Sequence, residues 1–263
     1  MLMALTMAII VLGSLFSTSI YAACPTTILA GNGSTSANAR APLGNFRFER
    51  GVYLITAADI AAAGFASGQT IGNITWTYAT GHNISVAGTL KVWFENTADV
   101  TSTKSTTWAT AVATMSNAHN AAATIPVGTS FGVNLTGAPF TYTGGGLYVA
   151  FEWSNAVNPL STGAVVACTN QPVVGMLNSA QSNLGLPVTL TTSNFRPQTT
   201  ITASGFANDA KVGLIYTQGK LANSYTAGHV VRARITNDGS NTLTNLPVTL
   251  NITGANSFSD VQT

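Results

Sequence analysis

The sequence predicts an all-β protein whose main part is an antiparallel β-sandwich of the jelly-roll type. Short segments alternate apolar and polar residues, as in "LKVWFE" (90–95) and "GLYVAFEW" (146–153). Turn-forming stretches such as "TGGG" and "NPLSTG" separate these segments at short intervals. Many short alternating segments between Gly, Asn and Pro turns are typical of antiparallel sandwiches. Only 7% of residues are charged, but 46% are hydrophobic, which favours a folded chain over a disordered one.

The first 23 residues, "MLMALTMAIIVLGSLFSTSIYAA", differ from the rest. An apolar stretch at 1–16 is followed by small polar residues and then by two alanines. This arrangement is typical of a secretory signal peptide and is short for a membrane span. No Lys or Arg precedes the apolar stretch, so either the amine of Met1 serves alone or the true start lies upstream. We therefore expect an exported protein, secreted or on the cell surface, with no transmembrane span.

Two cysteines, Cys24 and Cys168, leave three alternatives open. Export makes a disulfide chemically feasible. Both could instead be unpaired thiols. Cys24 directly follows Tyr-Ala-Ala, so it could also be the lipidated first residue of a mature lipoprotein, although lipoproteins usually carry Leu where this chain has Tyr21.

Residues 24–206 are expected to form the first domain. Besides the two segments quoted above, strands are expected at 73–78, 127–135, 164–168 and 187–192. The alternation places Leu90, Val92 and Phe94 on one face of their strand. One segment, "TAADIAAAG", predicts a helix of about two turns, with Thr56 as its cap, Asp59 three residues on, and Gly64 at its end.

The pattern restarts after about residue 206. "AKVGLIYTQGK" and "HVVRARIT" read as strands, and Asn237-Asp238-Gly239 is a strong hairpin turn because Gly accepts a positive φ. We expect residues 231–235 to pair across this turn with 248–252. Pro247 stands at the first residue of the returning strand, where a missing donor is tolerated.

Residues 207–263 resemble the cell-adhesion-related immunoglobulin-like module known as CARDB. The resemblance rests on "VVRARITNDGSNTLTNLPVTLNITG". An immunoglobulin-like sandwich needs about 100 residues and seven strands. The resemblance therefore implies a truncated, partial immunoglobulin-like sandwich with further domains downstream.

The first domain is similar to the amino-terminal sandwich of large secreted proteins of Bacteroidota, which use type IX secretion. The stretches that carry this resemblance are "FERGVYLITAADIAAAG", "NTADVTSTKSTTWATAV" and "FTYTGGGLYVAFEW". The resemblance implies a large modular protein of the surface or the medium, and it brings no catalytic motif.

Several motifs match catalytic or metal-binding patterns only in part. "GTSFG" (128–132) matches the nucleophile elbow, but a strand follows where the elbow needs a helix, so Ser130 is expected to be a strand serine. His82, His119 and His229 lack zinc spacing, and His82 and His119 are expected in solvated turns.

The carboxylates give no stronger signal. Glu95 and Glu152 are the pair on central strands, and both fall on the polar face, as expected of surface carboxylates. Glu95 with Asp99 lacks the dense spacing of a calcium loop. The sequence therefore predicts no catalytic residue, no metal and no cofactor. The net charge of +2, without any run of Lys or Arg, argues against nucleic-acid partners.

Aromatic residues are the best lead to a ligand. Trp93 lies between Lys91 and Glu95 on the polar face, Tyr148 shares a face with Glu152, and Trp108 lies outside any core pattern. An exposed Trp or Tyr is a flat apolar plate on which a sugar can stack. Trp93, Trp108, Tyr148 and Glu152 are therefore the candidate glycan-binding residues. The alternative is that Trp93 packs under a loop or against Lys91, with both faces of the sheet covered.

These observations favour a non-catalytic structural or adhesive module of a longer secreted or cell-surface protein, with a glycan or a surface component as partner. The alternative is a carbohydrate-binding accessory region of a secreted hydrolase. In neither case is the chain itself expected to be an enzyme.

Overall fold

The computed structural model describes residues 25–156, 161–170, 175–206, 210–216, 232–237, 242–253 and 258–262. The chain divides into two compact units. One spans Ala22–Ser204 and the other takes in Gly205–Thr263. The division falls within strand β14 (Thr199–Phe206), beside the boundary expected near residue 206.

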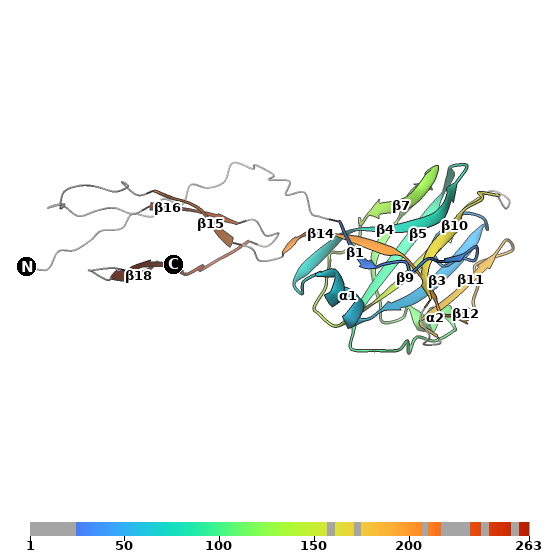
Figure 1. The fold of residues 1–263 in the computed structure, drawn as a ribbon, viewed down its shortest axis with the longest axis horizontal. Coiled ribbons are helices and arrows are strands. Elements are labelled where there is room, and N and C mark those ends of the chain that lie inside the picture. The colour runs from blue at the N-terminus through green and yellow to red at the C-terminus, as the bar shows by residue number, and fades with distance from the viewer. Residues whose placement is uncertain are drawn as a thin grey trace, which may run out of the picture. The chain divides into compact units, whose positions relative to one another are not determined.

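The first unit contains two antiparallel sheets (Figure 1). The strands of the first sheet, in path order, are β1 (Pro25–Leu29), β14, β4 (Gln69–His82), β10 (Val165–Asn170) and β13 (Phe195–Pro197). Three short strands attach to this path: β2 (Ser34–Ser36) on β10, and β7 (Gly128–Asn134) and β8 (Phe140–Thr141) on β4.

The second sheet has the order β12 (Thr191–Ser193), β11 (Leu177–Ser182), β3 (Phe48–Ile55), β9 (Gly146–Ser154), β5 (Val86–Thr97) and β6 (Ser116–Ile125). In Figure 1, β3, β9 and β5 run alongside one another, as their registers require. The expected all-β antiparallel sandwich is confirmed.

The main core lies between the two sheets, and the alternation of the sequence builds it. The predicted inner faces are confirmed on three strands: Ile74, Trp76 and Tyr78 of β4; Leu90, Val92 and Phe94 of β5; and Leu147, Val149, Phe151 and Trp153 of β9. Phe131 of β7 lies against Trp76 and Trp153, with ring centroids 6.1 and 6.2 Å away. Aromatic pairs of this kind add to the free energy gained from apolar burial.

A second apolar cluster lies on the outer face of the second sheet. It contains Val52, Leu54, Trp108, Ala111, Met115, Tyr148, Ala150, Met176 and Leu190. Two segments cover this face, 98–115, which includes the short helix α2 (Trp108–Ala111), and 183–190. They meet where Trp108 N donates to Val188 O at 2.9 Å and Leu190 N donates to Thr106 O at 2.7 Å. The central strand β9 is therefore buried on both faces.

The predicted helix is confirmed as α1 (Ala57–Ala63). Thr56 and Asp59 form a capping box, and Gly64 ends the helix with φ 74°. A side chain at Gly64 would be strained in this left-handed conformation. Asp59 also accepts a hydrogen bond from Arg196 Nη1 at 2.8 Å, which ties α1 to the first sheet.

The strand expected at 187–192 is largely wrong. Regular structure begins only at Thr191, where β12 starts. Residues 187–190 instead cover the outer face, with Leu190 buried in the second cluster and Val188 66% exposed. The alternation of apolar and polar residues could not distinguish a strand from a covering loop, because such a loop can also bury every second residue.

In the second unit, β15 (Ala210–Tyr216) pairs with β16 (Arg232–Asn237), and β17 (Val248–Ile252) pairs with β18 (Phe258–Gln262). The strand windows are confirmed, but the expected pairing of 231–235 with 248–252 is wrong for the described residues. Ten residues separate β16 from β17, too many for a two-residue hairpin, and each strand has another partner. Asp238 and Gly239 of the expected turn lie outside the described residues.

The described helices include none that is long and apolar enough to cross a membrane. The segment expected to be a signal peptide, 1–23, lies outside the described residues.

Candidate functional site

The four residues expected to bind a glycan come together on the outer face of the second sheet. Trp93 of β5 lies opposite Ala150 of β9, and Lys91 lies opposite Glu152. The rings of Trp93 and Trp108 meet edge to face, with centroids 5.5 Å apart. The sequence predicted the polar strand face for Trp93, Tyr148 and Glu152, but it did not predict that Trp108 joins them.

Their exposure is not as predicted. Trp108 is 6% exposed, Tyr148 0% and Glu152 4%. These three side chains cannot serve as an open stacking surface because segments 98–115 and 183–190 cover them. Trp93 is half-buried and packs against the same cluster, which agrees with the alternative that it lies under a loop. The guanidinium of Arg50 lies over the ring of Trp108, 4.9 Å from its centroid.

Glu152 holds two cations beneath this cover. It accepts a hydrogen bond from Arg50 Nε at 2.8 Å and a second from Arg50 Nη2, and Lys91 Nζ lies 2.8 Å from its other oxygen. Burial would raise the pKa of Glu152, but the hydrogen bonds and charges of Lys91 and Arg50 outweigh burial and hold this pKa below its ordinary value. Glu152 is thus an ionised structural carboxylate, and the expectation that it lies on the solvated surface is wrong.

A second polar group ties segment 98–115 to the sheet. Tyr148 donates its hydroxyl to Asp99 Oδ2 at 2.7 Å and accepts from Thr103 N at 2.8 Å. Lys104 Nζ binds Glu95 at 2.8 Å and lies 5.0 Å from the Tyr148 ring. Glu95 and Asp99, considered above as calcium ligands, are thus bonded to donors of the protein.

The other motifs also have structural places. Ser130 lies in strand β7, as predicted. The expectation of solvated turns is wrong for His82, 2% exposed at the end of β4, and for His119, 3% exposed in β6. His82 Nε2 lies 3.0 Å from Leu43 O, and burial lowers the pKa of both rings. His229 lies outside the described residues.

Cys168 is a buried, unpaired thiol in β10. Burial raises its pKa to about 12, so the thiol is neutral at pH 7. The disulfide considered above is not formed at Cys168. Cys24 lies outside the described residues, and its lipidation stays a prediction.

Glu49 is the most enclosed carboxylate among the described residues. It is 0% exposed, and its oxygens accept from the backbone N–H of Leu43 at 2.7 Å, Gly44 at 3.3 Å and Phe46 at 3.2 Å. Burial raises the pKa of Glu49 to about 7, although these hydrogen bonds act in the opposite direction. The carboxyl group therefore anchors loop 43–46 to β3.

This raised pKa predicts a pH dependence of stability. Between its ordinary pKa of 4.5 and about 7, the folded chain keeps a proton on Glu49 that the unfolded chain releases. The stabilising contribution is thus full below pH 4.5 and is lost as the pH rises through 7. We expect it to total about 3 kcal/mol. Unfolding in urea from pH 4.5 to 8 measures it.

Glu49→Gln is the control, because glutamine does not titrate while the two buried histidines still do. Between pH 4.5 and 8, the free energy of unfolding should fall more in the unchanged protein than in the Glu49→Gln variant, and the difference is the contribution of Glu49. Identical slopes would show that Glu49 ionises freely in the folded chain.

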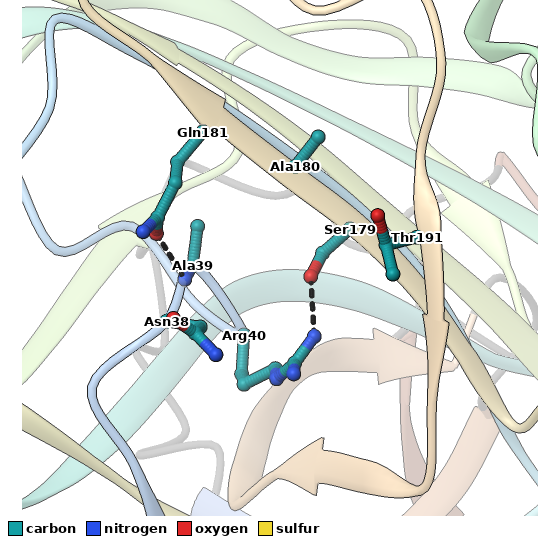
Figure 2. A pocket seen from close by; sticks show the side chains of 7 residues that line it. All are labelled: Asn38, Ala39, Arg40, Ser179, Ala180, Gln181 and Thr191. Atoms are coloured by element: carbon teal, nitrogen blue, oxygen red, sulfur yellow. Dashed lines mark hydrogen bonds between the residues drawn. The ribbon is translucent and has the colours of Figure 1, made fainter.

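A hollow between segment 38–40 and strand β11 was not foreseen from the sequence (Figure 2). It has a volume of about 220 Å³ and is lined by Asn38, Ala39, Arg40, Ser179, Ala180, Gln181 and Thr191. Arg40 Nη1 donates to Ser179 Oγ at 2.7 Å, and Ala39 N donates to Gln181 Oε1 at 2.8 Å. These two bonds fix segment 38–40 against strand β11. The local signal was weak: Ser179 and Gln181 stand two apart in "NSAQS", on one face of a strand.

Arg40 is a half-buried cation without a carboxylate partner among the described residues. Arg50, Lys91, Lys104 and Arg196, by contrast, each pair with a glutamate or an aspartate. Burial lowers the pKa of Arg40 below its ordinary value; the Cys168 thiol acts in the opposite direction but is neutral at pH 7. The guanidinium remains charged, because the ordinary pKa of an arginine lies far above neutral pH. The hollow therefore presents hydrogen-bonding groups around an uncompensated positive charge.

Fold and site together define an all-β sandwich protein with a hollow that contains one arginine, Arg40. No protein-family model matches the sequence, and no curated protein matches it significantly. Among solved structures, the chain is similar to the cysteine protease and lectin-like domains of Cwp84, a surface-layer associated protein of Clostridium difficile. The identity is 10% and the TM-score 0.37. The similarity covers 60% of this chain and 32% of that one.

Proposed function

We propose that this chain is a non-catalytic structural or adhesive module of a secreted or cell-surface protein. The observation that carries the proposal is the use of its carboxylates. A catalytic acid or base needs a carboxyl group that reaches its substrate. In the described part of the sandwich, each carboxylate is bonded to protein donors: Glu49 to a loop, Asp59 to Arg196, Glu95 to Lys104, Asp99 to Tyr148, and Glu152 to Arg50 and Lys91.

The rest of the proposal relies on the sequence. The amino-terminal stretch supports export, and Cys24 offers a lipid anchor. The resemblance to sandwiches of large secreted Bacteroidota proteins and to CARDB modules supports a place among several β-modules. A surface module of this kind needs a rigid scaffold, and the two apolar clusters on either side of β9 supply one.

The test uses the mature chain, residues 24–263. It is incubated with bacterial cell envelopes and with insoluble cellulose, chitin and pectin, and both the bound protein and the soluble products are measured. We expect retention on at least one surface without release of sugars or peptides. Steady release of soluble products would make the chain an enzyme and overturn the proposal. Failure to bind any surface would remove the adhesive role.

A second candidate function, carbohydrate binding, is favoured by the hollow at Arg40. Amide and hydroxyl groups on a concave surface are suited to the hydroxyls of a sugar. At about 220 Å³ the hollow is smaller than pockets for drug-sized ligands, which run to about 300–1,000 Å³, and so it suits a single sugar residue.

Two variants decide between the hollow and the aromatic face. Asn38→Ala removes an exposed amide from the hollow, and we expect it to weaken retention on polysaccharide about 2- to 10-fold, the effect of one hydrogen bond. Trp93→Ala changes the covered outer face and should leave retention unchanged once both proteins are shown to be folded. The reverse pattern would return the site to Trp93.

A further inference from the structure

We propose that the hollow recognises the carboxylate of an acidic sugar residue, which Arg40 binds through its Nη2. This inference rests on the second candidate function, carbohydrate binding at the same hollow, and it names the chemical class of the ligand.

Arg40 has a positive charge that no carboxylate among the described residues compensates. Moving a cation out of water costs free energy, and the paired cations of the sandwich offset that cost with a carboxylate. Arg196, 1% exposed, has Asp59, and Arg50 has Glu152. Arg40 has only the neutral hydroxyl of Ser179. An anion that enters the hollow would supply the missing partner.

The guanidinium of Arg40 is held in place by one of its nitrogens, and this leaves another donor for a ligand. The bond to Ser179 uses Nη1 and holds the group in place, as Figure 2 shows. Nε is buried and has no hydrogen-bond partner, and Nη2 makes no hydrogen bond to the described residues. These two nitrogens form one edge of the guanidinium, and Nη2, which is not buried, is the donor of that edge that a carboxylate oxygen in the hollow can reach.

The same protein shows how this edge binds a carboxylate. Arg50 uses its Nε and Nη2 to bind a single oxygen of Glu152, while its Nη1 donates to the backbone oxygen of Pro187. Arg40 is similar in that Nη1 is anchored to the protein and Nη2 is left without a hydrogen bond to the described residues. Among the described residues, no carboxylate takes the place beside Arg40 that Glu152 takes beside Arg50.

The neighbours of Arg40 favour a sugar as the carrier of the carboxylate. Asn38, Gln181 and Thr191 supply amide and hydroxyl groups that can meet ring hydroxyls, and Ala39 and Ala180 supply small apolar surface. None of the residues that line the hollow is acidic, so nothing in it repels an anion. A uronic acid residue combines the carboxylate, the hydroxyls and the size that the hollow accepts.

The experiment titrates the mature chain with trigalacturonate and, separately, with its fully methyl-esterified form. The two ligands share the same sugar rings, and the ester lacks only the charge. We expect the acid to bind at least about 10-fold more tightly, because hydrogen bonds between charged groups are the strong ones. Raising the salt concentration should reduce this preference.

Three variants assign the preference to Arg40. Arg40→Gln should abolish the preference for the acid, and Arg40→Lys should retain part of it. Arg47→Gln is the matched control, because Arg47 also lacks a carboxylate partner among the described residues but lies outside the hollow, over the ring of Phe48. It should leave the preference unchanged.

The possible negative results of these titrations distinguish this inference from the proposed functions. Equal affinity for acid and ester would overturn this inference and leave carbohydrate binding intact. Binding of neither ligand would overturn this inference. If the chain were also retained on cell envelopes but on none of the polysaccharides, carbohydrate binding would be overturned as well and the adhesive proposal would stand. If Arg40→Gln failed to fold, the comparison of acid with ester on the unchanged chain would still decide.

Discussion

Replacing Glu152 by leucine is expected to destabilise the sandwich by about 3–5 kcal/mol. Glu152 is 4% exposed and is the carboxylate partner of Arg50, whose side chain is 12% exposed. Without the carboxylate, the guanidinium stays buried beneath the covering loops with no opposite charge to offset its desolvation. Lys91 contributes less to the loss, because its side chain is 36% exposed and can turn into solvent.

The free energy of unfolding in guanidinium chloride measures this effect. Tryptophan fluorescence follows the sandwich alone, because all four tryptophans, residues 76, 93, 108 and 153, lie in it. A double variant, Glu152→Leu with Arg50→Met, removes both charges and should recover most of the loss. A cost below about 1 kcal/mol for the single variant, the value of an exposed ion pair, would show that solvent reaches Arg50.

Gly88→Ala is expected to cost about 1–3 kcal/mol or more, because it overpacks the main core. A Cβ at Gly88 would lie 2.4 Å from Trp153 Cζ2 and 2.6 Å from the backbone oxygen of Ser154. Trp153 is 0% exposed and packed on Phe131, so it has little room to move. The backbone oxygen belongs to β9, which pairs with β5 at this point.

Gly185→Ala is the matched control for this variant. Its Cβ would meet no atom within 4 Å, and Gly185 is not among the glycines with positive φ. The substitution should therefore be neutral or slightly stabilising, because alanine restricts the unfolded chain. Thermal unfolding of the two variants side by side gives the comparison, and equal midpoints would contradict the packing of Trp153 over Gly88.

The candidate site shows how far sequence reasoning reached. Alternation placed Trp93, Tyr148 and Glu152 on the side of their strands opposite the main apolar face, and the structure agrees. The same reasoning took that face to be open, because Lys91, Glu95 and Glu152 made it polar. These charges instead form ion pairs beneath segments 98–115 and 183–190. Glu152 pairs with Arg50 and Lys91, and Glu95 pairs with Lys104.

The sequence by itself determined the elements whose causes are local. Period-two alternation defined β4, β5 and β9 and their inner faces, and Thr56, Asp59 and Gly64 defined both ends of α1. Only the tertiary structure decided what covers each face and which distant groups meet. Arg40 and Ser179 are 139 residues apart, and no local pattern encodes their contact. Burial and charge pairing depend on neighbours in space, and those neighbours come from strand order and loop placement.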